Sequence, residues 1–302
     1  MAEVAICVCT RRRPEGIITL LKSINELDIP SGTNIKVIVT ENDSEPYTKS
    51  VISDISTTAD FKIEYYLETN PGISYARNRT VKEAGKVDYC CFVDDDQSVD
   101  KKWLTELLRC RDEFNSDGVW GPNPPVFSKD YPEYIKQFHT PEYYNYGTKV
   151  KQAYTNCLLI KKEWLDKFDG PFDLRLNYTG GEDSFLTANI INSGGTIVYT
   201  PYAKAYEVVP DERTTLRYFM KRTTRTINTK YIVLSFLDKN FSKTSILPRL
   251  ILRFVYGIIT SLPYLIFSKK NKYKGILKIS DSAGGLLFVF GKKNKFYNLN
   301  KN

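Results

Sequence analysis

Apolar segments alternate with amphipathic ones over the first 67 residues, and this alternation constrains the fold most. Buried strands are predicted at three apolar runs, residues 4–9, 35–40 and 61–67. Apolar side chains at helical spacing predict helices between them, over residues 16–27 and 47–56. This order predicts an α/β fold with a parallel sheet covered by helices on both faces.

Polar side chains follow the predicted strands, at the edge of the sheet where such folds bind ligands. The clusters are Thr10, Arg11 and Arg13 after the first strand, Glu41 and Asp43 after the second, and Asp94, Asp95 and Asp96 after a further apolar run at residues 89–93. Each cluster alone is compatible with an ordinary loop. Their convergence predicts a ligand site at this edge.

Three successive carboxylates at one strand end repel each other, so their charge must be offset. They can be splayed into water, or they can share a hard divalent cation, which prefers carboxylate oxygens. Residues i and i+2 of an extended segment point to the same side, so Asp94 and Asp96 can face one ion together. A solvated acidic turn is the alternative, and the rest of the chain favours the cation.

Two glycine-containing turns precede further candidate residues. After the turn at residues 70–72, Ser74 is expected to cap a helix that carries Arg77, a suitable partner for a diphosphate or else a surface residue. Gly180 and Gly181 let the backbone approach a ligand closely. The acidic pair that follows them opens a helix to about residue 191, where acidic residues are also ordinary partners of the helix dipole.

These segments together resemble the inverting family 2 glycosyltransferases of the GT-A fold, in a bacterial branch. The resemblance covers about residues 3–230. It is carried by the runs Gly72-Ile-Ser-Tyr-Ala-Arg-Asn78, Phe92-Val-Asp-Asp-Asp96, Trp103-Leu104, Gly180-Gly-Glu-Asp-Ser-Phe185 and Glu207-Val-Val-Pro-Asp-Glu-Arg213, followed by Arg222 and Arg225. It implies a Rossmann-like nucleotide-binding sheet with flanking helices over residues 1–230.

The resemblance implies a site for a nucleotide sugar and a metal ion. Its Asp-x-Asp motif falls on Asp94 and Asp96, which would hold Mn²⁺ or Mg²⁺ and the ribose–diphosphate, and its base-contacting acidic residue falls on Glu41. The residues expected to contact the donor are Thr10, Arg11, Arg13, Glu41, Asp43, Arg77, Asn78, Asp94 and Asp95. Where the family often closes the metal site with a histidine, this chain has Glu207, either a ligand or a structural residue. The only histidine, His139, lies elsewhere in the sequence.

The resemblance also places the catalytic base on the Glu-Asp pair after the second glycine turn. Asp183 is predicted to be the base, and Glu182 and Gly181 are expected to contact the acceptor. Residues 118–154, rich in tyrosine, are expected to form a long irregular loop that closes over the site or binds sugar, with ordinary packing as the alternative. A strand is predicted over residues 153–161, and a further one over residues 196–200.

The last part of the chain, residues 231–302, is predicted to be a helical, membrane-associating extension. An apolar stretch at residues 246–267 contains Arg249 and Arg253, and only about 14 uncharged residues follow them, fewer than the roughly 20 that span a bilayer. An interfacial or re-entrant helix pair with basic flanks is predicted. A buried helical subdomain is the alternative.

The net charge of +8 and the pI near 9.0 indicate an anionic partner. Nucleic acid is disfavoured because the basic residues lie beside apolar runs and no recognised motif interleaves them. The six cysteines lack metal-finger spacing, and two pairs of them lie inside predicted buried strands. Free buried cysteines indicate a reducing cytosol, and no signal peptide is expected.

The sequence therefore predicts a metal-dependent inverting transferase at the cytoplasmic face of a bacterial membrane. The donor is expected to be a nucleotide sugar, with UDP favoured, and the acceptor a hydroxyl of a cell-surface glycan or lipid-linked saccharide. A non-catalytic module that binds nucleotide sugars or glycans is the alternative.

Overall fold

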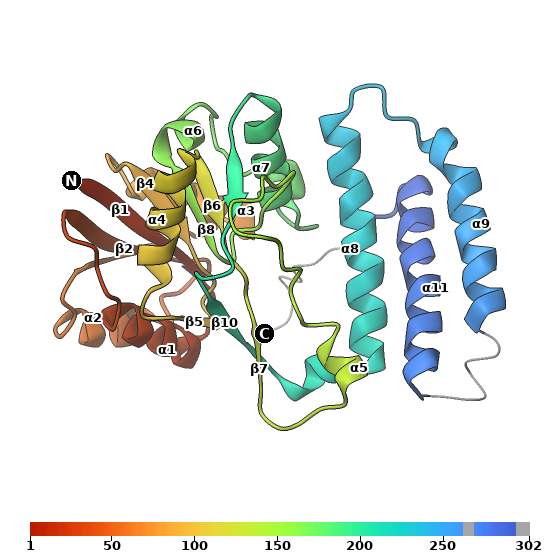
Figure 1. Ribbon diagram of the computed structural model, residues 1–302, viewed down its shortest axis with the longest axis horizontal. Coiled ribbons are helices and arrows are strands. Elements are labelled where there is room, and N and C mark those ends of the chain that lie inside the picture. Colours follow the sequence, from red (N-terminus) through yellow and green to blue (C-terminus); the bar gives the residue numbers. More distant parts are fainter. Residues whose placement is uncertain (262–268, 294–302) are drawn as a thin grey trace.

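A computed structural model describes residues 1–261 and 269–293 of the chain, and its centre is a seven-stranded sheet (Figure 1). The strand order is β3-β2-β1-β4-β8-β6-β9. The strands are β1 (Ala2–Thr10), β2 (Thr33–Glu41), β3 (Lys62–Leu67), β4 (Tyr89–Phe92), β6 (Gly118–Trp120), β8 (Leu158–Lys161) and β9 (Ile197–Tyr199). The strands β1 to β4 pair in parallel, as predicted, whereas β8 is antiparallel to β4 and β6 and makes the sheet mixed.

Helices cover both faces of this sheet because successive residues of each buried strand point to opposite faces. In β1, Val4, Ile6 and Val8 pack on the face covered by α1 (Pro14–Asn25), α2 (Lys49–Ser56) and α4 (Trp103–Phe114). Ala5 and Cys7 pack on the face covered by α3 (Ile73–Glu83), α6 (Lys162–Asp166) and α7 (Glu182–Asn192). The predicted α/β fold with helices on both faces is confirmed.

The expectation of one irregular loop over residues 118–154 is wrong in part. This segment contains β6 in the main sheet, β7 (Pro125–Phe127) and the short helix α5 (Glu133–Lys136). Three-residue strands are too short to show a period in the sequence. The strand predicted over residues 153–161 is also shorter than expected and begins at Leu158.

A second, three-stranded sheet lies beyond the carboxyl end of β4. Its order is β5-β10-β7, from β5 (Gln97–Val99), β10 (Ala205–Val209) and β7. The antiparallel pair of β5 and β10 sets Glu207 opposite Gln97. This register brings a residue from late in the chain next to the acidic cluster that follows β4.

The start of α3 differs from the prediction because Ser74 does not cap it. The N-cap position is Gly72, with φ of 126°, and the Asn177 amide supplies the cap by accepting a hydrogen bond from the Ser74 backbone N–H at 3.0 Å. Asn177 also donates to the Pro71 carbonyl at 2.9 Å, and it belongs to the turn after the 3₁₀ helix η1 (Leu174–Leu176). A side chain at position 72 would collide with this amide.

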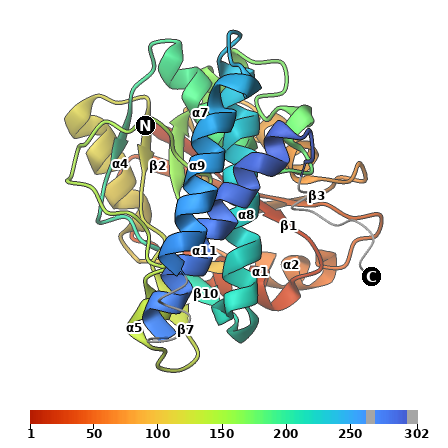
Figure 2. The same cartoon turned by 90° about the vertical axis from the view of Figure 1, so that its right-hand side faces the viewer.

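The described residues of the C-terminal part form a helical layer that contains α8 (Leu216–Leu237), α9 (Lys243–Ser261) and α11 (Lys269–Val289). Helix α8 follows the 3₁₀ helix η2 (Asp211–Thr214) and contacts α7, whereas α9 lies at the outer face of the layer (Figures 1 and 2). Helix α8 runs through the predicted domain boundary at residue 230, and the division into two domains stays a prediction.

The predicted apolar stretch at residues 246–267 falls partly on α9. Its last part, residues 262–267, lies outside the described residues. Within residues 1–261 and 269–293, every helix is too short or too polar to cross a membrane.

Candidate active site

The polar clusters predicted after β1 and β4 meet around Asp95. Its carboxylate accepts hydrogen bonds from Thr10 Oγ1 at 2.7 Å and from Arg13 Nη1 at 2.8 Å, and it is 5% exposed. Burial raises the pKa of Asp95, and Arg13 and Thr10 oppose that rise. Asp95 therefore links the end of β1 to the end of β4 by hydrogen bonds. The neighbouring Asp94 and Asp96 have other contacts.

Asp94 and Asp96 lie in the turn that begins where β4 ends, and cations approach them from different sides. Arg77 Nη2 lies 3.5 Å from Asp94 Oδ1. Asp96 Oδ2 lies 3.2 Å from Arg13 Nη1. Packing of protein around its carboxylate raises the pKa of Asp94 to about 7, with Arg77 opposing this rise and the other two aspartates and Glu207 adding to it. Because 43% of its side chain is still exposed, a ligand can reach it.

Glu207 reaches the same cluster from β10. Its Oε1 accepts a hydrogen bond from Arg213 Nη1 at 2.9 Å, and its Oε2 accepts one from Asn123 Nδ2 at 3.1 Å. Burial raises the pKa of Glu207, and repulsion from Asp96 raises it further. The second nitrogen of Arg213, Nη2, lies 3.5 Å from Asp96 Oδ2, so one guanidinium bridges the two carboxylates.

The chemistry of this donor set fits a hard divalent cation, because Asp94, Asp96 and Glu207 offer only carboxylate oxygens. Within the described ranges, no group of three or more His, Cys, Asp or Glu side chains is arranged closely enough to hold a metal ion. In this arrangement guanidinium groups neutralise the carboxylates. A bound cation would have to take over part of that role.

Two of the predicted donor residues, Arg11 after β1 and Asp43 after β2, form a separate ion-pair cluster with Arg12. Asp43 accepts hydrogen bonds from Arg11 Nε at 3.3 Å and from Arg12 Nε at 2.7 Å. Burial alone would raise the pKa of Asp43, but the hydrogen bonds from Arg12, the Ser44 backbone and Arg11 outweigh it and lower the pKa to about 2. Asp43 is therefore ionised and holds the loop after β1 against the loop after β2.

Glu41 is fully buried at the end of β2. Its Oε2 accepts hydrogen bonds from the backbone N–H and the hydroxyl of Thr48, both at 2.9 Å, and from Tyr65 at 2.7 Å. Its Oε1 has no hydrogen-bond partner among the residues that the structure describes. Glu41 therefore stabilises the start of α2, and its Oε1 remains able to accept a hydrogen bond.

Arg77 connects the acidic cluster to α7. One nitrogen contacts Asp94, and Nη1 donates a hydrogen bond to Glu182 Oε1. Glu182 is 2% exposed, and burial raises its pKa to about 7 although Arg77 opposes the rise. The carboxylate of Glu182 thus positions Arg77 in this structure, and its predicted contact with an acceptor stays a prediction.

Asp183, the predicted base, is the next residue of α7 and is only half-buried. Its Oδ1 accepts hydrogen bonds from the Ser184 backbone N–H at 2.6 Å and from the Ser184 hydroxyl at 3.4 Å. Its other oxygen makes no hydrogen bond within the described residues. Adjacent helical residues diverge by about 100°, which explains why Glu182 turns inward while Asp183 faces solvent.

Gly181 and Asn78 both make structural contacts. Gly181 has φ of 88°, and a Cβ at this position would lie 2.5 Å from Thr229 Cγ2 of α8. Asn78 exchanges two hydrogen bonds with the Phe172 backbone, at 2.8 and 2.9 Å. These contacts fasten the loop before α7 to α3 and α8. The expected ligand contacts of Gly181 and Asn78 remain predictions.

Three residues at this site were not assigned a role from the sequence: Arg213, Asn123 and His139. His139 Nε2 lies 3.0 Å from the Arg213 carbonyl, and its Nδ1 lies 3.5 Å from Arg222 Nη1. The only histidine therefore lies beside Arg213, which contacts the acidic cluster, although it is remote from Arg213 in sequence. Arg213 ends one of the quoted motif runs, whereas His139 comes from an irregular loop, and no sequence pattern pointed to it.

The sheet topology, with a cluster of carboxylates at the end of β4, is that of a GT-A-like fold. Residues 5–168 match the model of glycosyl transferase family 2. The chain is also 30% identical, over 225 residues, to the succinoglycan biosynthesis protein ExoM of Rhizobium meliloti (strain 1021), covering 74% of this chain and 72% of that protein. The protein belongs to glycosyl transferase family 2.

Solved structures share the fold at low sequence identity. The mannosyltransferase PcManGT from Pyrobaculum calidifontis, in complex with GDP-Man and Mn²⁺, superposes with a TM-score of 0.68 at 15% identity, covering 96% of this chain and 87% of that one. S. aureus TarS 1–349 in complex with UDP superposes with a TM-score of 0.52 at 18% identity, covering 99% and 95%. These likenesses confirm the predicted GT-A fold.

Proposed function

We propose that the protein is a metal-dependent, inverting glycosyltransferase that uses a UDP-linked sugar. The observation that carries this proposal is the double contact of Arg77, which holds Asp94 of the acidic cluster beside the start of α7, where Asp183 lies. A donor diphosphate at the acidic cluster would then face a half-exposed carboxylate. This is the arrangement that direct displacement at the anomeric carbon requires.

In this reaction the oxygen of an acceptor hydroxyl bonds to the anomeric carbon as the bond from that carbon to the diphosphate oxygen breaks. Asp183 takes the hydroxyl proton, and the nucleoside diphosphate leaves with the electron pair of the broken bond. Attack from the side opposite the leaving group inverts the configuration. Arg77 and Arg213, which contact the acidic cluster, are proposed to stabilise the negative charge that develops on the leaving group.

A divalent cation, when bound, would supply further neutralisation of the diphosphate. Asp94 and Asp96 are the proposed ligands, with Glu207 as a third. The manganese complex of PcManGT supports this assignment by analogy.

The base of the nucleotide is proposed to contact the buried Glu41, whose Oε1 has no partner within the described part of the chain. The TarS complex with UDP supports a UDP-linked donor. The PcManGT complex with GDP-Man makes a GDP-linked donor the competitor that an experiment must include.

The acceptor is proposed to be a cell-surface glycan or a lipid-linked saccharide, and the enzyme to act at the cytoplasmic face of a bacterial membrane as a peripheral protein. The similarity to a succinoglycan biosynthesis protein supports a polysaccharide pathway. The basic and apolar character of α9 and its surroundings supports contact with a membrane.

The test is the release of nucleoside diphosphate from a panel of UDP- and GDP-linked sugars by the full-length protein in Mn²⁺. We expect slow metal-dependent hydrolysis of one donor, lost in excess chelator and strongly reduced in Asp183→Asn. Binding of a nucleotide sugar with no turnover, even with saccharide acceptors added, would indicate a non-catalytic binding module instead.

A further inference from the structure

The outer face of α9 carries a dense group of exposed large apolar residues. Six lie within nine positions: Ile251, Leu252, Val255, Tyr256, Ile258 and Ile259. Leu252 is 69% exposed and Ile259 is 61% exposed. Single exposed apolar residues are normal on a protein surface, but a contiguous patch marks an interaction site.

This patch lies on the side of α9 opposite to the side that packs against α11. Leu250 is buried against Gly285 of α11, and Gly257 lies against the backbone of α11 near Lys278. Leu252, Val255 and Ile259 are three and four residues apart, so they share the opposite, outward face. We call the outward set Leu247, Pro248, Ile251, Leu252, Val255, Ile258 and Ile259 the α9 stripe.

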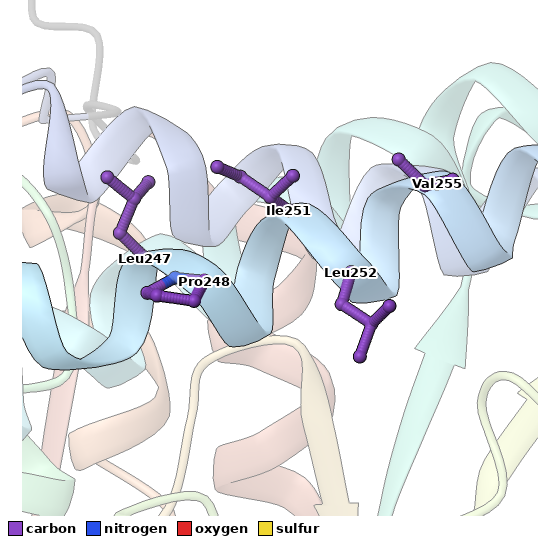
Figure 3. A pocket seen from close by; sticks show the side chains of 5 residues that line it. All are labelled: Leu247, Pro248, Ile251, Leu252 and Val255. Carbon is purple, nitrogen blue, oxygen red and sulfur yellow. The ribbon is translucent and has the colours of Figure 1, made fainter.

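Apart from the half-buried Leu247, the residues of the α9 stripe are exposed. Five of its residues line a shallow apolar groove, and all five come from α9 alone, with the ribbons of α8 and α11 behind it (Figure 3). Figure 2 shows α9 in front of the other helices of the layer. The stripe is therefore open to a partner with an extended surface.

The charge around the stripe identifies the kind of partner. Residues 243–302 contain twelve Lys and Arg residues and one acidic residue, Asp281, so this segment carries a formal charge of +11. The preceding 242 residues carry −3, and thus the whole positive balance of the chain lies in the segment that bears the stripe. Such a segment attracts an anionic surface.

Basic groups border the stripe along one edge of α9. Arg249 and Arg253 are one turn apart, and both are exposed. Lys278 of α11 lies over the ring of Tyr256, at 5.2 Å from its centroid. Apolar side chains flanked by cations and an aromatic ring with a polar tip are the composition of a helix that lies in a membrane interface.

We propose that the α9 stripe docks in the headgroup region of a bilayer that contains anionic phospholipids. The helix would lie in the plane of the membrane, with the stripe among the upper acyl chains and Arg249, Arg253 and Lys278 at the phosphates. This inference rests on the proposed function for its placement of the enzyme at a membrane and names the face that makes the contact. Helices α11 and α8 separate α9 from the central sheet, so docking leaves the site uncovered (Figure 1).

The alternative partner for the α9 stripe is a second copy of the chain, which would form a dimer through this face. Pairing two stripes would bring two segments of charge +11 together, with Asp281 as the one acidic residue in each. Repulsion between them opposes this association, whereas the same charge favours an anionic lipid surface. The observations therefore favour lipid.

The test is flotation of the full-length protein with vesicles of phosphatidylcholine or of equimolar phosphatidylcholine and phosphatidylglycerol. We expect binding to the second only, weakened by salt. Leu252→Ser/Ile259→Ser should lower the partition coefficient at least about tenfold, because two exposed apolar side chains lose their burial in lipid. The matched control, Ile29→Ser/Leu234→Ser, also removes two exposed apolar side chains, but away from α9, and should bind like wild type.

The basic edge is tested separately. Arg249→Gln should weaken binding to the anionic vesicles by about fivefold, and Arg249→Lys should not, since each surface cation contributes about 1 kcal/mol. Flotation of the stripe variant at the wild-type level would overturn the proposal. Equal binding of the wild type to neutral and anionic vesicles would also overturn it. A third contradicting result would be a wild-type dimer that becomes a monomer in the stripe variant while flotation stays unchanged.

Hydrolysis of nucleotide sugars in the absence of lipid, measured on the same samples, separates the two proposals. Hydrolysis without flotation would refute the docking surface alone. Flotation without hydrolysis of any donor would refute the proposed function and leave the docking surface standing.

Discussion

Arg213 donates a hydrogen bond of 2.9 Å to Glu207, and its second nitrogen, Nη2, lies 3.5 Å from Asp96. A guanidinium group thus bridges two carboxylates that are proposed to face a metal ion. Because like charges repel, this group competes with a divalent cation for the same oxygens. Under the proposed function, the Arg213 guanidinium would become available to the donor diphosphate once a cation neutralised the carboxylates.

Arg213→Gln should therefore strengthen the binding of Mn²⁺ to the protein without nucleotide, by roughly five- to tenfold. One unit charge about 4 Å away contributes about 1 kcal/mol in water and more inside a protein. Binding of the UDP–Mn²⁺ complex should weaken, because the diphosphate loses a charged donor. Electron paramagnetic resonance of free Mn²⁺ measures the first effect, with Arg213→Lys as the charge-preserving control. Weaker Mn²⁺ binding by Arg213→Gln would contradict this account.

Asp183→Asn should lower the rate of transfer by roughly the 10²–10⁴-fold that a general base contributes, with UDP affinity nearly unchanged. Its half-exposed carboxylate is free to meet an acceptor, whereas Glu182 is buried against Arg77. Steady-state turnover and UDP calorimetry on the same protein separate chemistry from binding. Normal turnover in Asp183→Asn would show that another group is the base.

Glu182→Gln should behave differently, because it removes one of the two carboxylates that contact the buried Arg77. Breaking a buried ion pair by removing one member costs roughly 3–5 kcal/mol, so we expect a clear fall in the free energy of unfolding as well as weaker UDP binding. Denaturant unfolding is the measurement. A variant that loses turnover but keeps full stability would reverse the roles of Glu182 and Asp183.

Asp43 should make the stability of the protein depend on acid. Its pKa is lowered from the ordinary 3.8 to about 2 in the folded protein, so its ion pairs contribute stability above pH 3.8 that is lost as the pH falls toward 2. The difference in melting temperature between wild type and Asp43→Asn should be largest above pH 4 and should shrink between about pH 4 and 2. A difference that stays constant over this range would mean that the Arg11 and Arg12 contacts do not stabilise the fold.

Gly181→Ala should destabilise the protein through a clash that a second substitution can relieve. The added Cβ would lie 2.5 Å from Thr229 Cγ2, and φ of 88° disfavours any side chain. Thr229→Ser removes this methyl and keeps the hydroxyl that donates to the Thr179 carbonyl at 2.9 Å. The double variant should recover part of the loss and retain a backbone cost of about 1–2 kcal/mol. Denaturant unfolding measures the three free energies of unfolding. If the losses from the two single substitutions simply add in the double variant, the proposed contact is contradicted.

The sequence predicted the elements whose pattern is local. The strands β1 to β3 and the helices α1 and α2 follow from periodicity, and the polar ends of β1 and β4 meet as expected, Thr10 with Asp95. Contacts between segments that are distant in the sequence could not be predicted from such local patterns. Asn177 caps a helix that begins about 100 residues earlier, and the register of β10 with β5 brings Glu207 to Asp96.

The burial and the partners of each carboxylate could not be predicted from the sequence either. Glu182 and Asp183 are adjacent in the chain, yet one is 2% exposed and ion-paired while the other faces solvent. Helical geometry turns the two side chains about 100° apart, and the buried Arg77 pairs with Glu182. Likewise, only the three-dimensional arrangement places His139 beside Arg213.

The central claim is that a metal ion and a nucleotide diphosphate bind together at Asp94 and Asp96. Calorimetric titration of UDP into wild type and Asp96→Ala, each with Mn²⁺ and with excess chelator, tests it most directly. The account predicts that chelator weakens UDP binding to wild type by at least roughly tenfold, and that Asp96→Ala in Mn²⁺ binds as weakly as wild type in chelator. Equal UDP affinity in all four titrations would contradict it.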